Sequence, residues 1–268
     1  MLDMGRICTD LQAEQEDLDH LLTGLSEADW DRQTPAVGWS IRDQVSHLGT
    51  TDRVATMAAG EPARFTAEIL HQDRRERMAR QLETGRSMPG PVLLAWWRTG
   101  RHAMLEVFRQ LDPKTRIPWF GPAMSALSFA TARLMETWAH GQDIVDTLGV
   151  QRQATERLQH VAHIGVRARP FSYTVRGLTP PAEEVRVELR SPAGTVWTWG
   201  ATASTNTIIG EALDFCLVVT QRRHITDTRL RLIGPLAQEW MHIAQAFAGP
   251  AGPGRQPGQF SSAPEMPG

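Results

Sequence analysis

The sequence has little cysteine, lysine or tyrosine, and it has no long apolar run. Only two of the 268 residues are cysteines, which excludes a disulfide scaffold and a four-cysteine zinc site. Lys114 is the only lysine, so Schiff-base chemistry is not expected. No apolar run approaches the roughly 20 residues of a membrane span, and the acidic, amphipathic start differs from a signal peptide. We therefore expect a soluble cytoplasmic protein.

The sequence also lacks an excess of charge of either sign. Its formal net charge is −2 and its isoelectric point is about 6.5, so no overall basic field attracts nucleic acid or an anionic membrane. Hydrophobic residues make up 41% of the chain, enough to bury the core of one large domain or two ordinary ones. The nine tryptophans are suited to cores and small-molecule pockets. We expect a small-molecule partner, and neither nucleic acid nor membrane.

The first half of the chain has the pattern of long helices joined by short connections. Apolar residues recur at helical spacing in segments at about 5–25, 40–59, 64–84, 91–111 and 125–148. Ser40 and Asp43 have the S-x-x-D pattern of a helix N-terminal cap, and Gly149 is the residue type that commonly ends a helix. This arrangement predicts an antiparallel helical bundle.

The second half changes character. Residues 185–190 and 195–199 alternate between apolar and polar side chains around a Ser-Pro-Ala-Gly turn, which predicts a β-hairpin. Helical patterns at about 209–221 and 236–247 flank a predicted strand at 229–233. The fold class is therefore predicted to be α+β. We predict four parts, which are a helical bundle at 1–150, a helix and linker at 151–180, a small α+β domain at 181–250 and a disordered Gly/Pro-rich tail at 251–268.

The strongest chemical signal is a Glu-x-x-x-His pattern in the last predicted bundle helix. Glu136 and His140 share one helix face, where they can bind one divalent metal; a solvated pair is the alternative. The flanking residues are apolar, and buried charges need partners. His47, between Val45 and Leu48, is the candidate third ligand, with a core histidine bonded to a carbonyl as the alternative. Two histidines, one carboxylate and open positions describe a catalytic site.

Other candidate residues carry weaker signals. Arg222 and Arg223 follow an apolar helical run, where cations stabilise a helix C-terminus or bind a substrate carboxylate. Trp119 lies in a loop between two prolines and lines either a pocket mouth or the core. Three aspartates are candidates to orient a ligand imidazole, with ordinary surface carboxylates as the alternative. They are Asp52, Asp143 and Asp146.

Two segments resemble a known family. Gly38-Trp-Ser-Ile-Arg-Asp-Gln-Val-Ser-His-Leu48 resembles the first signature of DinB-like four-helix metal proteins, GW-[ST]-x-x-D-x-x-x-HL. Ala132-Arg-Leu-Met-Glu-Thr-Trp-Ala-His-Gly-Gln-Asp143 resembles the second signature of their mycothiol-dependent maleylpyruvate isomerase branch in actinobacteria. Residues 185–254 resemble the C-terminal domain of that branch.

The resemblance implies a DinB-like four-helix bundle followed by a small α+β domain. It further implies zinc or another divalent ion held by His47, Glu136 and His140; many relatives have three histidines, and the glutamate matches the isomerase branch. Mycothiol, a low-molecular-weight thiol, is the implied nucleophile. Arg222 or Arg223 is the nearest match to an arginine implicated in the chemistry of that branch.

These observations lead to one hypothesis and two alternatives. The hypothesis is a divalent-metal-dependent isomerase or S-transferase, in which zinc, or else nickel, iron or manganese, binds the thiol and lowers its pKa. Arg222 or Arg223 would bind a carboxylate of a small electrophilic substrate, and Trp119 would contact the cofactor. The first alternative is a metal-dependent hydrolase or cyclase of secondary metabolism. The second is a non-catalytic protein that binds a small ligand.

Overall fold

The computed structural model describes residues 3–260. The chain divides into two compact units, with the boundary between Arg152 and Gln153. The predicted bundle ends two residues before this boundary, and the segment predicted as a helix and linker belongs to the second unit from residue 153 onward. No helix within the described residues is long and apolar enough to cross a bilayer.

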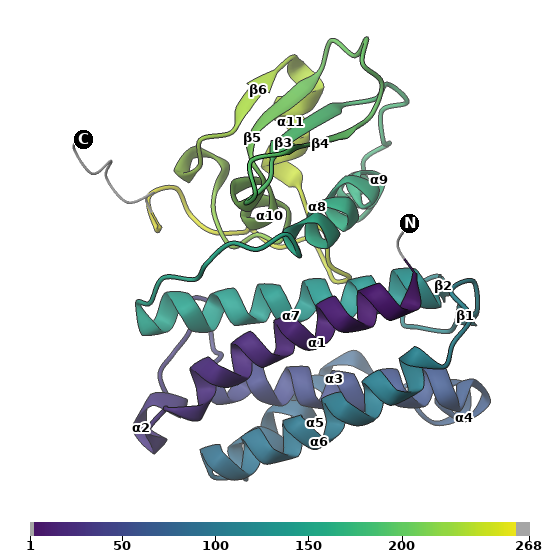
Figure 1. The fold of residues 1–268 in the computed structure, drawn as a ribbon, viewed down its shortest axis with the longest axis vertical. Helices are drawn as coiled ribbons and strands as arrows, with labels where there is room; N and C mark the ends of the chain where they lie inside the picture. Colours follow the sequence, from purple (N-terminus) through teal and green to yellow (C-terminus); the bar gives the residue numbers. More distant parts are fainter. Residues whose placement is uncertain (1–2, 261–268) are drawn as a thin grey trace. The chain divides into compact units, whose positions relative to one another are not determined.

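Four long helices form the frame of the first unit (Figure 1). They are α1 (Met4–Thr23), α3 (Ile41–Gly60), α6 (Gly90–Arg109) and α7 (Ala126–Leu148). Helix α1 packs against α6 and α7, and α3 packs against the same two helices, so α1 and α3 occupy opposite corners of a four-helix bundle. The connecting elements are α2 (Glu27–Trp30), α4 (Pro62–Glu68), α5 (Arg74–Arg86), β1 (Arg116–Ile117) and β2 (Met124–Ser125).

Local capping explains where α3 begins and where α7 ends. The Ser40 hydroxyl accepts a hydrogen bond from the Asp43 N–H, and the Asp43 carboxylate accepts one from the Ser40 N–H at 3.0 Å. This reciprocal capping box satisfies donors that the first turn leaves without helical partners. Gly149 ends α7 with a φ of 68°, in the left-handed region that favours glycine. Both predicted helix ends are therefore present.

The predicted helix at 64–84 is divided in two. Helix α4 ends at Glu68. Asp73 begins α5, because its carboxylate accepts hydrogen bonds from the N–H groups of Arg75 and Glu76 at 2.8 and 3.1 Å. The charged pattern runs through this segment without interruption, which is why the sequence alone did not reveal the break.

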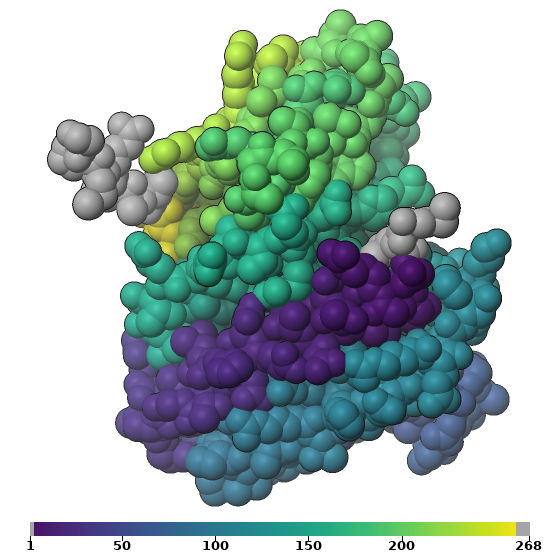
Figure 2. Space-filling model, viewed as in Figure 1, coloured from purple at the N-terminus to yellow at the C-terminus, as the bar shows by residue number. Residues whose placement is uncertain are grey.

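Buried apolar side chains from all four long helices form the core of the bundle. One cluster contains Leu18, Leu22, Trp30, Ile41, Val45, Leu48, Leu93, Leu94, Trp97 and Ile144. Burying each large side chain contributes about 1.5–3 kcal/mol. Gly49 allows α3 and α6 to approach closely, because a Cβ at this position would lie 2.3 Å from the Trp96 ring. Figure 2 shows the side chains of α1 at the surface between those of α6 and α7.

The second unit contains a four-stranded mixed sheet. Its elements are α8 (Leu158–Arg167), α9 (Arg169–Thr174), β3 (Arg186–Arg190), β4 (Val196–Trp199), β5 (Thr207–Glu211), α10 (Ala212–Val219), a 3₁₀ turn η1 (Ile225–Asp227), β6 (Arg231–Ile233) and α11 (Pro235–Ile243). The strand order is β4-β3-β5-β6, in which β3 and β5 are parallel and the other pairs are antiparallel. The predicted hairpin is the β3–β4 pair, and the predicted α+β class is confirmed.

The segment predicted as a helix at 209–221 begins as a strand. Strand β5 inserts between β3 and β6, and α10 starts only at Ala212. Ile208 on β5 is fully buried, so the apolar run serves first the sheet and then the helix. A short apolar run does not distinguish a strand from a buried helix.

Residues 249–260 form neither helix nor strand, but they have defined contacts. The Gly258 N–H donates to both carboxylate oxygens of Asp227, at 2.8 and 3.0 Å. The buried Gln245 amide donates to three carbonyls, those of Phe247, Gly249 and Pro250. The disorder expected for 251–268 stays a prediction, and residues 261–268 lie outside the described part of the chain.

Candidate metal centre

Three side chains from two neighbouring helices meet at one point in the bundle. His47 comes from α3, and Glu136 and His140 come from successive turns of α7. The Nε2 atoms of His47 and His140 lie 3.8 and 3.2 Å from the same Glu136 oxygen, Oε2. One ligand atom from each side chain lies within 4.8 Å of the other two. The structure thus brings together the three residues that the sequence suggested as metal ligands.

The other nitrogen of each imidazole faces a glutamine. His140 Nδ1 lies 2.5 Å from Gln44 Oε1, and His47 Nδ1 lies 3.1 Å from Gln81 Oε1. An amide oxygen only accepts, so this arrangement favours a proton on each Nδ1 and leaves each Nε2 directed at Glu136. This is the usual outer support of a metal-binding histidine. No local pattern in the sequence indicates either glutamine, because each partner is distant along the chain.

The indole ring of Trp39 packs against both imidazoles. Its ring stacks on the His140 ring, with centroids 5.9 Å apart and an interplanar angle of 14°. It also lies 5.2 Å from the His47 ring in a tilted arrangement. The two imidazoles are 4.6 Å apart. Trp39 directly precedes the cap residue of α3, so the turn that starts this helix also places the indole over the site.

The electrostatic environment keeps Glu136 ionised. Burial raises the pKa of its carboxyl, but His140, His47 and the charge of Arg133 outweigh burial and hold this pKa well below its ordinary value. The side chain remains 22% exposed, so the carboxylate is not sealed from small molecules. An anionic oxygen beside two imidazole nitrogens is the donor set of a divalent cation.

A buried ion pair joins α3 to α7 beside this site. Arg133 donates to Asp52 Oδ1 through Nε and Nη2 at 3.2 and 2.9 Å, and Trp97 Nε1 donates to Asp52 Oδ2 at 3.1 Å. The Asp52 and Arg133 side chains are 0% and 3% exposed. Asp52 therefore does not orient an imidazole and is not a surface carboxylate. It links the two helices that carry the three candidate ligands.

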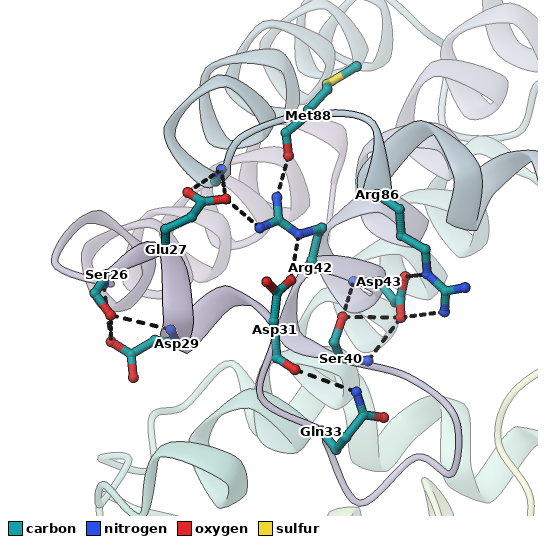
Figure 3. Close-up of polar contacts among 11 residues, drawn as sticks. Ser26, Glu27, Asp29, Asp31, Gln33, Ser40, Arg42, Asp43, Arg86 and Met88 are labelled. Atoms are coloured by element: carbon teal, nitrogen blue, oxygen red, sulfur yellow. Dashed lines mark hydrogen bonds and ion pairs between the residues drawn. The ribbon is translucent and has the colours of Figure 1, made fainter.

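Two further arginines brace the first turn of α3 (Figure 3). Arg42, with a side chain only 6% exposed, donates to Asp31 and Glu27 at 2.9 and 2.5 Å. Arg86 from α5 donates to both carboxylate oxygens of Asp43 at 2.9 Å. These pairs tie the start of α3 to α2 and α5, about one turn before the candidate ligand on this helix.

Trp119 packs within an aromatic cluster of the first unit. It lies in the loop between β1 and β2, where its ring stacks on Phe65 with centroids 5.7 Å apart. It also meets Phe129 edge-on at 4.8 Å. Phe129 lies on α7, two helical turns before Glu136. The contacts found for Trp119 are with these aromatic rings rather than with the three candidate ligands, and its role toward a cofactor stays a prediction.

Arg222 and Arg223 lie in the second unit, just after α10. Arg222 Nη1 donates to the Thr220 carbonyl at 2.7 Å, and the residue is 9% exposed. The Arg223 guanidinium lies 4.4 Å from the centroid of the Phe260 ring. Among the described residues, Arg223 lines a small cleft of about 40 Å³ whose charged or titratable lining consists of Arg176, Arg223, His224, His242 and Arg255. The lining favours an anionic group.

The first unit has the DinB-like four-helix fold, and a small α+β unit follows it along the chain. Residues 11–145 match the family model of the mycothiol maleylpyruvate isomerase N-terminal domain, and the chain belongs to this family.

The chain is also similar to two relatives and to two solved structures. Two uncharacterized proteins from strains of Mycobacterium tuberculosis are each 45% identical over 258 residues, which cover 95% of this chain and 100% of the relative. The crystal structure of a mycothiol-dependent maleylpyruvate isomerase matches with a TM-score of 0.55 at 14% identity. A histidine-to-alanine mutant of this isomerase matches with a TM-score of 0.58 at 13% identity. Each match covers 83% of this chain and 90% of the other, and shows a shared fold.

Proposed function

We propose that the protein is a divalent-metal-dependent enzyme that uses a low-molecular-weight thiol, mycothiol, to isomerise a small electrophile or transfer sulfur to it. The observation that carries this proposal is the convergence of His47, Glu136 and His140 within 4.8 Å. Membership in the mycothiol maleylpyruvate isomerase family supports the thiol and the reaction class. We also propose that the protein is cytoplasmic.

The side chains at this point fit a divalent cation. Two imidazole nitrogens and an ionised carboxylate match a three-ligand site with open positions for a guest. We propose zinc first, with nickel, iron or manganese as alternatives, because this donor set discriminates poorly among them. Such an ion would supply the positive charge that lowers the pKa of a thiol.

The other residues of the chain would have supporting roles. Trp39 covers one side of both imidazoles and would keep water from that side. Trp119, in its aromatic cluster, is proposed to contact the thiol cofactor. Arg223 is proposed to bind a substrate carboxylate, because it lines the basic cleft of the second unit. Arg222 is the weaker candidate, since the residue is buried, with 9% of its surface exposed.

Metal analysis of the purified protein tests the ligand assignment. We expect wild type to bind one ion per chain, and we expect Glu136→Gln and His47→Ala to weaken zinc affinity by more than about 100-fold, since even outer residues of metal sites contribute 10–100-fold. Glu83→Gln, an exposed change on α5, is the control and should bind like wild type. Wild-type metal content in Glu136→Gln would remove the basis of the proposal.

Turnover measurements then distinguish the function classes. Maleylpyruvate, the substrate named in the family, serves as the first probe with and without mycothiol. Turnover that requires both the metal and mycothiol supports the proposal, and a raised KM in Arg223→Met supports the role of this arginine. Metal-dependent hydrolysis or cyclisation without a thiol would favour the first alternative. Ligand binding that survives a chelator, without turnover, would favour a binding protein.

A further inference from the structure

We propose that Gln44 is a positioning residue that fixes the proton of His140 on Nδ1 and directs its Nε2 toward Glu136 before any metal arrives. Gln44 is in turn aligned by Thr34 and by the backbone carbonyl of Trp39. This inference deepens the proposed function and rests on it where metal affinity is concerned. The property that the experiment measures, the tautomer of the His140 imidazole, does not depend on a bound metal.

The backbone carbonyls beside Thr34 determine which groups donate in the hydrogen bonds between Thr34 and Gln44. The Thr34 hydroxyl lies 2.7 Å from the Trp39 carbonyl and 3.5 Å from the Ala36 carbonyl. Both carbonyls only accept, so the single hydroxyl proton goes to one of them. The hydroxyl oxygen must then accept from its remaining neighbour, Gln44 Nε2, which lies 2.9 Å away.

The amide orientation of Gln44 then determines the tautomer of His140. With the amide nitrogen turned to Thr34, the amide oxygen faces His140 Nδ1 at 2.5 Å. An oxygen without a proton can only accept, so Nδ1 must donate. The flipped amide would place two acceptors against each other at the Thr34 end, because the hydroxyl proton is already given to a carbonyl. At the His140 end it would donate to Nδ1 and so select the opposite tautomer. Gln44 is 0% exposed and Thr34 is 8% exposed, so bulk water does not replace these bonds.

Backbone hydrogen bonds hold Thr34 and the Trp39 carbonyl in place. Gln33 and Ser40 form an isolated antiparallel bridge, and the Thr34 N–H donates to the Trp39 carbonyl at 2.7 Å. This loop leads directly into the capping box of α3. Trp39 therefore acts twice at the site: its carbonyl ends the hydrogen-bonded chain and its indole stacks on His140.

His47 provides an internal contrast. Its Nδ1 faces Gln81 Oε1 at 3.1 Å, but among the described residues no hydrogen bond fixes the Gln81 amide nitrogen. Gln81 is also partly exposed. The tautomer of His47 is thus less strongly determined than that of His140, and Gln81→Leu should affect its imidazole less than Gln44→Leu affects His140.

The test uses matched variants and two measurements. Thr34→Val removes the hydroxyl but keeps the shape, and Thr34→Ser keeps the hydroxyl. Gln44→Leu removes the acceptor, and Gln44→Glu retains one. Long-range ¹H–¹⁵N spectra of the metal-free protein at alkaline pH report which nitrogen of His140 carries the proton, with His140→Gln assigning the signal. Chelator competition reports zinc affinity, and thermal melting checks the fold.

We expect the Nδ1–H tautomer of His140 in wild type, Thr34→Ser and Gln44→Glu, and a shift toward Nε2–H in Thr34→Val and Gln44→Leu. Zinc affinity should fall by roughly 10–100-fold in Gln44→Leu, as for other outer supports, and by about three- to tenfold in Thr34→Val, the effect of one ordinary hydrogen bond. Gln44→Glu should stay near wild type.

An unchanged His140 tautomer in Thr34→Val would overturn the inference, even if zinc binds normally. If Gln44→Leu does not fold, the Thr34 pair still decides the question. A wild-type protein that binds none of zinc, nickel, iron and manganese would defeat the proposed function instead, while the spectra would continue to test the role of Gln44.

Discussion

The two units place their functional side chains on different kinds of scaffold. In the first unit, His47, Glu136 and His140 lie on two regular helices, and a buried ion pair ties these helices together. In the second unit, the basic cleft forms where the chain leaves α10 through Gln221, with a φ of 59°, and meets irregular residues 252–255. A site on packed helices is held more precisely than one on loops. We therefore expect a preformed centre in the first unit and an adaptable cleft in the second.

The largest effect is expected from disrupting the buried ion pair between Arg133 and Asp52, which tests whether it holds the bundle site in place. Arg133→Met leaves the Asp52 carboxylate buried with Trp97 as its one remaining side-chain donor among residues 3–260, and we expect a loss of about 3–5 kcal/mol in the free energy of unfolding. Urea denaturation of the metal-free protein measures this loss. The helices would also lose the link that holds the candidate ligands in register.

A second arginine pair on α3 supplies the control. Arg86→Met removes the partner of Asp43, but the Arg86 side chain is 56% exposed and Asp43 keeps its bonds to Ser40. We expect a smaller loss, of about 1–3 kcal/mol, because the Asp43 carboxylate is buried but keeps its Ser40 donors. Equal losses in the Arg133 and Arg86 variants would show that burial does not determine the strength of the link between α3 and α7.

The next prediction concerns the irregular segment of the second unit. Gln245→Ala removes the amide that donates to the carbonyls of Phe247, Gly249 and Pro250. We expect about 1–3 kcal/mol of local destabilisation, seen as faster hydrogen exchange and proteolysis within residues 246–260. The bundle should exchange as in wild type. Gln256→Ala, at an exposed position, is the control; comparable exchange in both variants would contradict the anchoring role of Gln245.

The sequence predicts the parts of this fold that depend on neighbouring residues. The capping box of Ser40 and Asp43, the end of α7 at Gly149 and the β3–β4 hairpin all arise from contacts over a few positions. Strand β5 was not predicted, because its apolar residues continue directly into those of α10. Its identity as a strand depends on pairing with β3 and β6 rather than on local pattern.

The same distinction applies to the candidate centre. Glu136 and His140 are visible because i and i+4 share a helix face, and His47 emerges from its apolar neighbours and from the family signature. Gln44 and Gln81 were not predicted, because the bond from Gln44 to His140 spans 96 positions and exists only once α3 and α7 pack. Asp52 is a candidate from the sequence, but its partner Arg133 on α7 was not predicted.

The smallest predicted effect tests how α7, the helix that carries two of the candidate ligands, is terminated. Gly149→Ala puts a side chain at a φ of 68°, whereas Gly24→Ala changes the residue after α1 at a φ of −92°. Neither added Cβ would meet an atom within 4 Å, so the pair isolates backbone conformation from packing. We expect Gly149→Ala to lose about 1 kcal/mol. Gly24→Ala should be neutral or gain up to about 1 kcal/mol, because alanine restricts the unfolded chain. Thermal or urea unfolding of the two variants measures the difference, and equal stabilities would mean that the left-handed turn after α7 relaxes without strain.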